Sequence, residues 1–187
     1  MTAREFDPFR LDVVAFAKEA GEIGGRWPLA TFDRIADSAV PGAPVTDADE
    51  VSWHVRGEQR RLRGGDAQTW MHLTASTHVS LECQRCLKPV DVPLSIERNF
   101  LFVHGEDAAA QLDADTEDDV LAITRALDLR ELIEDELLLA MPIVPRHEVC
   151  PEPLVVAHDD EPANDDKPNP FAALAGLKRS GPLGGLN

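Results

Sequence analysis

A long period-two alternation of apolar and polar side chains is the feature that most constrains how this 187-residue chain can fold. Apolar residues take every second position over 51–55, 71–81 and 90–96, with Thr77 as a mild exception, and the parity continues to Phe102. Alternation of this length indicates strands that bury one face and expose the other. The short connections predict antiparallel neighbours and argue against a parallel sheet.

Two other segments show helical periodicity. Pro28 suits the first turn of a helix over 28–39. The apolar face of that helix consists of Leu29, Phe32, Ile35, Ala36 and Ala39. A second helix is predicted over 128–141, because Asp128 followed by Glu131 forms a capping box. Its apolar stripe consists of Leu129, Leu132, Ile133, Leu137 and Met141, and its solvated face of Glu134, Asp135 and Glu136.

These patterns predict an α+β fold in which an antiparallel β-sheet is packed by two or three helices. The sheet is either open or curled toward a barrel, and the alternation alone leaves both forms open. Weaker signals suggest a first strand within residues 6–14 and a short strand over 120–123.

Charge and proline content divide the chain into parts. Residues 1–150 are expected to form a single α+β domain, 151–168 an acidic linker, 169–180 a short C-terminal helix and 181–187 a tail. Within the domain, residues 105–119 carry seven acidic side chains and no Lys or Arg, which predicts an exposed, flexible acidic loop.

The overall composition restricts the class of partner. The formal charge of −16 repels phosphate backbones on average and suits basic partners, so DNA is not expected. No apolar signal core or membrane-length apolar run is present, which predicts a cytoplasmic protein without a membrane partner. Three cysteines in a reducing compartment argue against a structural disulfide.

Cys83 and Cys86 are spaced as a metal knuckle on a turn between two strands. His147 and Cys150 could complete a tetrahedral zinc site, although a gap of 60 residues separates the two pairs. The alternative is a set of unpaired thiols in a tight turn. A redox role is disfavoured, since such cysteine pairs usually lie at a helix N-terminus.

Basic residues cluster in the first strands and at the cysteine turn, and could contact RNA phosphates. They are Arg56, Arg60, Arg61, Arg63, Arg85 and Lys88. A solvated strand face, partly neutralised by Glu58, is the simpler interpretation. Likewise His54, His72 and His78 share the polar parity of their strands, but surface histidines are common. No arrangement typical of a catalytic site is evident, so we expect a protein that is not an enzyme.

A short apolar helix signal follows the acidic linker. Asn169 can cap it and Pro170 can take its first position, followed by Phe171, Leu174 and Leu177 at three-residue spacing. This segment either docks onto the body of the protein or binds a groove on a partner. The sequence leaves both alternatives open.

Three motifs together resemble the bacterial YceD family of large ribosomal RNA subunit accumulation proteins: Leu81–Pro89, Glu134–His147 and Lys167–Leu174. The resemblance implies a role in the synthesis, processing or stability of large-subunit ribosomal RNA. It implies neither catalytic residues nor a bound metal.

The leading hypothesis is therefore a ribosome biogenesis factor that acts as a non-catalytic acidic adaptor to a large-subunit ribosomal protein or an rRNA-processing factor. Direct RNA binding through the basic residues is the alternative. A metal-dependent RNA-processing enzyme is the third hypothesis, and it would need an open coordination position.

Overall fold

The computed structural model describes residues 5–61 and 67–152. The chain divides into two units at Glu152, and every described residue belongs to the first unit. Most of the expected linker, the C-terminal helix over 169–180 and the tail lie outside the described residues. Arg63 lies outside them as well.

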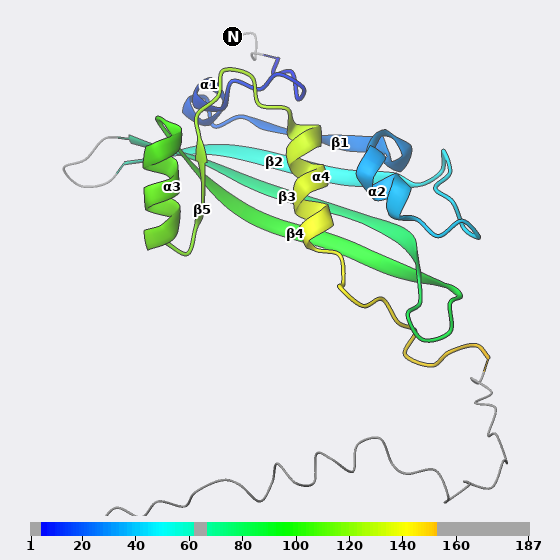
Figure 1. Cartoon of the computed structure of the whole chain (residues 1–187). Coiled ribbons are helices and arrows are strands. Elements are labelled where there is room, and N and C mark those ends of the chain that lie inside the picture. The colour runs from blue at the N-terminus through cyan, green and yellow to red at the C-terminus, as the bar shows by residue number, and fades with distance from the viewer. Residues whose placement is uncertain (1–4, 62–66, 153–187) are drawn as a thin grey trace, which may run out of the picture. The chain divides into compact units, whose positions relative to one another are not determined.

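Five strands form one sheet in the order β1-β2-β3-β4-β5, with helices packed on it (Figure 1). The elements, in chain order, are α1 (Val13–Lys18), β1 (Glu22–Pro28), the 3-10 turn η1 (Leu29–Thr31), α2 (Asp33–Ser38), β2 (Glu50–Arg61), β3 (Ala67–Glu82), β4 (Pro89–Val103), α3 (Glu106–Asp115), β5 (Asp119–Ala122) and α4 (Leu129–Leu139). This arrangement confirms the predicted α+β class.

The sheet is mixed rather than wholly antiparallel. β1 to β4 pair antiparallel as expected, but β5 pairs parallel to β4, with Leu101 opposite Val120. The prediction missed this pairing because it assigned no helix between the two strands. A helix there provides the crossover that a parallel pair requires. The sheet is also open, with β1 and β5 at its edges, so it does not close into a barrel.

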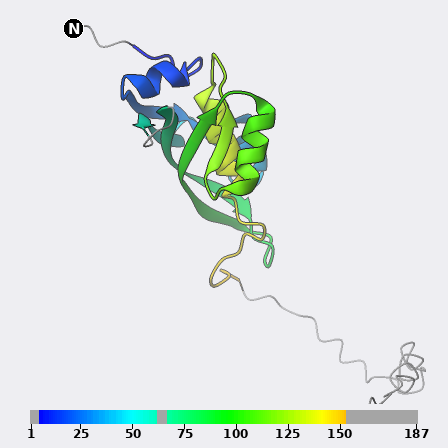
Figure 2. The same cartoon turned by 90° about the vertical axis from the view of Figure 1, so that its left-hand side faces the viewer.

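The helices cover the two faces unequally. α1, α2 and α4 pack on one face, where the alternating apolar side chains of β2, β3 and β4 form the main core with Phe16, Ile35 and Ile133. α3 lies beside β5 at one end of the sheet (Figure 2). Its Ala109 packs with Trp70 and Leu101, whose side chains belong to the opposite face, in a smaller cluster. The rest of that face carries the polar half of the alternation.

Residues 105–119 are not the loop that their charge suggested. Ten of them form α3, because Ala109 and Leu112 provide an apolar side that packs against Trp70 and Leu101. All seven acidic side chains are exposed, as their charge predicted, but the predicted loop is wrong because most of the segment is helical. Packing decided this segment, since its own amphipathic pattern is weak.

The N-terminal assignments also need correction. The weak strand within 6–14 is absent: Leu11 makes only an isolated bridge to Leu127, and Asp12 caps α1 by accepting from the Ala15 N–H. The helix over 28–39 is broken at Phe32 into η1 and α2, because the Phe32 backbone is not helical. β1 was missed, since its Gly24-Gly25 pair carries no alternating pattern.

α4 begins as predicted, with the Asp128 carboxylate accepting from the backbone N–H groups of Arg130 and Glu131. It ends at Leu139, two residues before the predicted end. Its predicted solvated face is wrong at Glu134 and Glu136, whose side chains are each only 12% exposed. Glu134 binds Arg34 at 2.9 Å, and Glu136 accepts from Arg98 Nε at 2.8 Å. The ion pair between Arg98 and Glu136 therefore connects β4 to α4.

Candidate metal centre and its surroundings

The tight turn that joins β3 to β4 holds the first two candidate ligands. Its closing bonds run from the Cys83 N–H to the Lys88 carbonyl at 3.0 Å and from the Leu87 N–H to the Cys83 carbonyl at 2.8 Å. Leu87 adopts a left-handed backbone with φ of 59°. The turn leaves Cys83 buried and Cys86 half-buried, with both thiols directed to one side.

The second pair of candidate ligands, His147 and Cys150, lies in the segment that follows α4. After Leu139 the chain runs back along the sheet to the tip of the β3–β4 hairpin (Figure 1). A backbone hydrogen bond from the Gln84 N–H to the Pro145 carbonyl, at 2.9 Å, fixes it there. This contact places His147 and Cys150 against the turn.

The four predicted ligands therefore lie together. One ligand atom from each of Cys83, Cys86, His147 and Cys150 lies within 4.8 Å of all the others. Nδ1 of His147 is 3.4 Å from Sγ of Cys86, and its backbone N–H lies 3.5 Å from Sγ of Cys83. Ligand atoms around a tetrahedral zinc lie about 3.3 to 3.8 Å apart, from bond lengths near 2.0 and 2.3 Å. The four residues are close enough to hold a metal ion.

The local electrostatics favour a thiolate at one position. Burial raises the pKa of Cys83, but hydrogen bonds from the backbone N–H groups of His147, Arg85 and Cys86 outweigh it and lower the pKa to about 5. The pKa of Cys150 is raised by burial and by the adjacent Cys86 thiol. The cluster therefore combines one thiol that ionises readily with one that resists ionisation. A nearby cation would favour the thiolate form of both, because metal binding requires thiolates.

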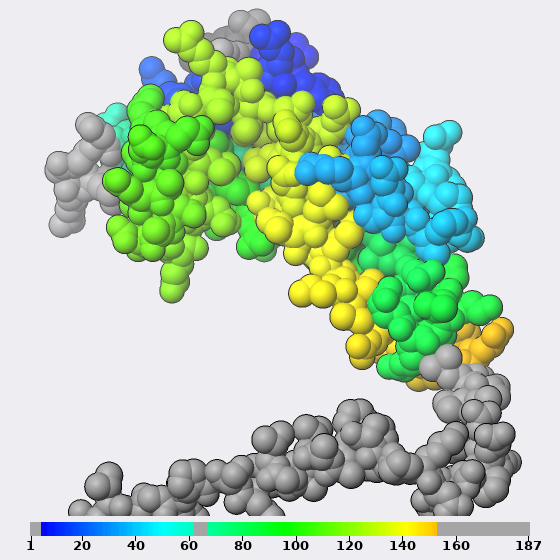
Figure 3. Space-filling view, in the orientation of Figure 1, coloured from blue at the N-terminus to red at the C-terminus, as the bar shows by residue number. Residues whose placement is uncertain are grey.

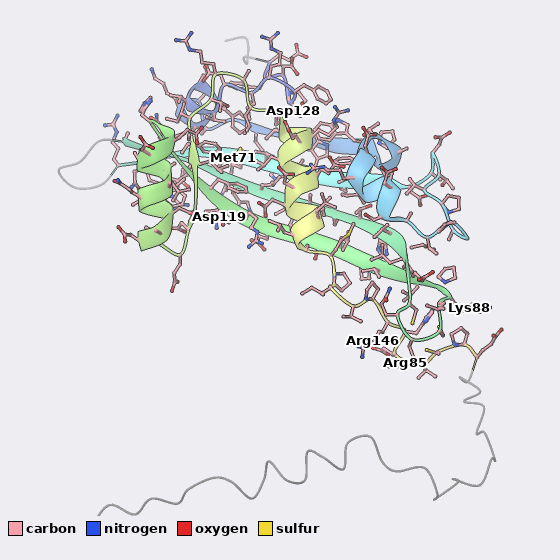
Figure 4. The ribbon with its side chains drawn as sticks, in the orientation of Figure 1. Met71, Arg85, Lys88, Asp119, Asp128 and Arg146 are labelled. Atoms are coloured by element: carbon pink, nitrogen blue, oxygen red, sulfur yellow. The ribbon has the colours of Figure 1, made fainter. Side chains whose placement is uncertain are left out.

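The predicted basic cluster is divided between two ends of the molecule. Arg61 pairs with Ala67 at the start of β3, whereas Arg85 and Lys88 follow its end. Sixteen residues of strand separate these ends, a length of about 50 Å. Figure 4 places Arg85 and Lys88 at the tip of the β3–β4 hairpin together with Arg146, which the sequence analysis did not single out.

The strand arginines are partly engaged with neighbours. Nε of Arg60 lies 3.1 Å from the Glu58 carboxylate, and its guanidinium lies 4.3 Å from the centre of the Trp70 ring. Arg56 is exposed and has no ion-pair partner in the described part of the chain. The five of these basic residues that the structure describes therefore do not form one continuous surface.

Exposed apolar side chains occur in both segments that supply the candidate ligands. Leu87, Ile143 and Val149 are 66%, 98% and 84% exposed. Sequence reasoning missed them, although the run Pro142-Ile143-Val144-Pro145 carries a usable signal: apolar residues that belong to no helical or alternating pattern. Exposed apolar side chains gathered at one place often mark an interaction surface.

The three histidines do not form a site. His54 lies 2.8 Å from Glu22 and His78 lies 3.1 Å from Asp91, while His72 is bonded to Asn99 at 2.9 Å. His72 and His78 lie six positions apart on β3, which separates them by about 20 Å. Each is a surface histidine with a neighbour on the adjoining strand.

Among the described residues, no helix is both long enough and apolar enough to cross a membrane.

Comparison with known proteins supports the motif resemblance. The sequence profile of the family described as "Large ribosomal RNA subunit accumulation protein YceD" matches residues 71–178, more than half of the chain. A protein of that name from Haemophilus influenzae is 31% identical over 179 residues, covering 92% of this chain and 96% of its own length. No solved structure matches. The match includes the β3–β4 hairpin, all four candidate metal ligands and the C-terminal motif, and the chain belongs to the YceD family of large ribosomal RNA subunit accumulation proteins.

Proposed function

We propose that this protein promotes the accumulation of large-subunit ribosomal RNA as a non-catalytic adaptor, whose acidic surface binds a basic ribosomal protein or rRNA-processing factor. The observation that carries this proposal is the acidic surface of α3 and the turn after it. Seven carboxylates between residues 105 and 119 are exposed on a folded element, with no Lys or Arg among them. Such a surface attracts basic partners and repels nucleic acid.

The segment beyond Glu152 adds to the same property. Residues 152–166 contribute six more acidic side chains, and the apolar motif from Asn169 to Leu177 follows them. Phe171 and Leu174 would anchor such a motif in a partner's groove, with Pro170 setting its first turn. The acidic residues would then steer the encounter and the motif would hold it.

The metal cluster supports a structural role for a zinc ion. Three sulfur atoms and one imidazole match the ligand set of closed structural zinc sites. Held by Cys83, Cys86, His147 and Cys150, the ion would lock the chain after α4 onto the β3–β4 hairpin. Four protein ligands leave no open position for water or substrate, which favours a structural ion over a hydrolytic one.

Direct contact with RNA is a second candidate function, supported by the hairpin tip. Arg85 and Arg146 are exposed there and have no ion-pair partner among the residues that the structure describes. Lys88 is 3.8 Å from Glu152, a long and exposed pair that contributes little. The tip is therefore the better candidate for a phosphate contact than the strand arginines.

The adaptor proposal is tested by recovering pre-ribosomal material with the tagged protein, with and without ribonuclease. We expect ribosomal or processing proteins to stay bound after ribonuclease treatment. Deletion of residues 152–180 and, separately, neutralisation of Asp107, Asp115, Glu117 and Asp118 to amides should each abolish that association. Unchanged association in both variants would exclude the adaptor mechanism, and complete loss with ribonuclease in the parent protein would favour the RNA-binding candidate.

A further inference from the structure

A groove between β5 and α4 combines an apolar floor with an acidic rim. Its volume is about 360 Å³, within the range of ligand pockets in proteins. The floor consists of Phe102, Leu121, Leu127 and Leu132. Except for Phe102, these side chains are only partly buried, so the groove presents apolar surface to solvent. In the space-filling view the green surface of α3 and β5 lies beside the yellow surface of α4 (Figure 3). The residues that line the groove come from these elements, from β4 and from the segment that joins β5 to α4.

Four carboxylates form the rim: Glu106, Asp128, Glu131 and Asp135. No Lys or Arg occurs among the described residues that line the groove. The four are not equivalent, however. Asp135 is paired with Arg34 at 2.6 Å, and Asp128 accepts from the first turn of α4 (Figure 4).

Glu106 and Glu131 therefore dominate the charge that a ligand would meet. They come from α3 and α4 respectively, and neither has an ion-pair partner in the part of the chain that is described. A cationic side chain between them would meet carboxylates from two elements, while the neighbouring floor would take an apolar side chain. An anion, an RNA backbone or an acidic peptide would be repelled.

β5 adds a second feature that suits a peptide. It is an edge strand of the open sheet, and its Leu121 and Ala122 line the groove. Edge strands offer backbone hydrogen-bonding groups that an added segment can use. On β5 the Val120 N–H already bonds the Asp113 carboxylate at 3.1 Å, so the backbone at Ala122 is the part of the edge that suits an added segment. An apolar floor, an acidic rim and a strand edge are three properties that a basic amphipathic segment would satisfy together.

We propose that the groove between β5 and α4 is the docking site for a basic amphipathic peptide segment, in which Lys or Arg alternates with apolar residues. This inference rests on the adaptor function and specifies where the basic partner is held. Glu106 and Glu131 bind the cationic side chains, and Leu121, Leu127 and Leu132 bind the apolar ones. The acidic surface of α3 then attracts the segment toward the groove.

The test uses the full-length protein and a short labelled peptide of Lys and Leu, with binding followed by fluorescence anisotropy at about 0.15 M salt. A second peptide replaces every Leu by Ser and keeps the charge. The protein variants are Glu106→Lys with Glu131→Lys, and a matched control, Asp47→Lys with Glu82→Lys. The control changes the net charge equally at exposed positions outside the groove. Circular dichroism confirms that both variants are folded.

We expect the groove variant to weaken binding of the Lys–Leu peptide about tenfold or more, and the control variant to weaken it only slightly. The Ser peptide should bind the parent protein at least about tenfold more weakly than the Leu peptide. Equal weakening in both variants would overturn the proposal, because binding would then reflect general acidity only. Equal binding of both peptides would also overturn it, since the apolar floor would not take part.

Failure of the groove and failure of the adaptor function are distinguishable. The peptide assay uses purified protein, whereas the adaptor function is read from association with pre-ribosomal material. If the groove variant keeps ribonuclease-resistant association, the adaptor stands and the groove is not its site. If the peptide binds in the groove but no ribosomal or processing protein is recovered, the groove is a basic-peptide site and the adaptor mechanism is wrong.

Discussion

Nδ1 of His147 lies 3.4 Å from Sγ of Cys86, although 61 positions separate the two residues in the sequence. The contact exists because α4 returns the chain to the β3–β4 hairpin and the Gln84 N–H bonds the Pro145 carbonyl there. Two pairs of candidate ligands, Cys83 with Cys86 and His147 with Cys150, therefore form one cluster of four. An ion bound at this point would hold the last described segment to the sheet, so metal content and stability should be linked.

We predict that the purified protein contains about one zinc ion per chain, measured by elemental analysis. Replacement of Cys86 by Ser removes a ligand and should leave little metal bound. At a free zinc concentration of about 100 times the Kd of the site, loss of the ion should lower the free energy of unfolding by about 2.7 kcal/mol. Glu148→Gln, next to a ligand but outside the cluster, is the control. Absence of metal from protein purified without chelators would contradict this prediction.

A second prediction concerns the N-terminus of α2. Phe32, at its cap position, has no side-chain acceptor, and Glu134 on α4 takes that role. The Glu134 carboxylate accepts from the Arg34 N–H at 2.8 Å and also binds the Arg34 guanidinium at 2.9 Å. Glu134→Ala should lower the free energy of unfolding by about 1–2 kcal/mol, since it removes a helix cap and an ion pair.

The matched control is Asp135→Ala, which removes only the exposed ion pair to Arg34 and should cost less than about 1 kcal/mol. Urea unfolding of both variants provides the comparison. A larger effect of Asp135→Ala than of Glu134→Ala would show that the cap contributes nothing. Glu134→Gln keeps an acceptor and should fall between the parent protein and Glu134→Ala.

The close approach of α1 to the sheet gives a third prediction. A Cβ at Gly57 on β2 would lie 2.7 Å from the Phe16 ring and 2.8 Å from the Ala17 Cα. Gly57→Ala should therefore push α1 away from the sheet and cost about 1–3 kcal/mol of stability. A Cβ at Gly25 would meet nothing closer than 3.6 Å, so Gly25→Ala is the control and should be nearly neutral. Thermal unfolding of the two variants decides whether the contact is as tight as the structure indicates.

The separation of the basic residues gives a fourth prediction. If RNA binds at the hairpin tip, replacing Arg85 and Arg146 by Gln should weaken binding and reduce the salt slope by about 0.7 per lost contact with single-stranded RNA. Replacing Arg56 and Arg60 by Gln changes the net charge equally at a distant place and should leave the slope unchanged. The opposite pattern would assign RNA to the strand face. A parent protein without measurable RNA affinity would leave the adaptor as the one supported function.

Much of the fold was predictable because its signals are local. The alternation from Met71 to Phe102 defines a hairpin whose register needs no distant information. Asp128 and Glu131 likewise mark the start of α4 within one helical turn. The candidate ligands were predictable in type, because a Cys-x-x-Cys pair and a His-x-x-Cys pair offer four possible metal ligands. The gap of 60 residues between the pairs left unpaired thiols as the alternative.

The errors lie where the deciding contact is distant in sequence. α3 carries the composition of an exposed loop, and it becomes a helix because Trp70 and Leu101 offer a surface for Ala109 and Leu112. That helix in turn allows β5 to pair parallel with β4. The acidic groove has no local signature, since Glu106 and Glu131, the two rim carboxylates without an ion-pair partner among the described residues, come from different helices.

The sequence by itself determined β2 to β4, the start of α4, the four candidate metal ligands and the family. Periodicity and capping act over a few residues, so no knowledge of the fold is needed to recognise them. Only the tertiary structure decided that the two pairs of candidate ligands meet, that the basic residues separate to opposite ends of β3, and that an apolar groove lies beneath the acidic residues of α3 and α4. Each of these depends on where packing places segments that are far apart along the chain, and packing is a property of the whole core.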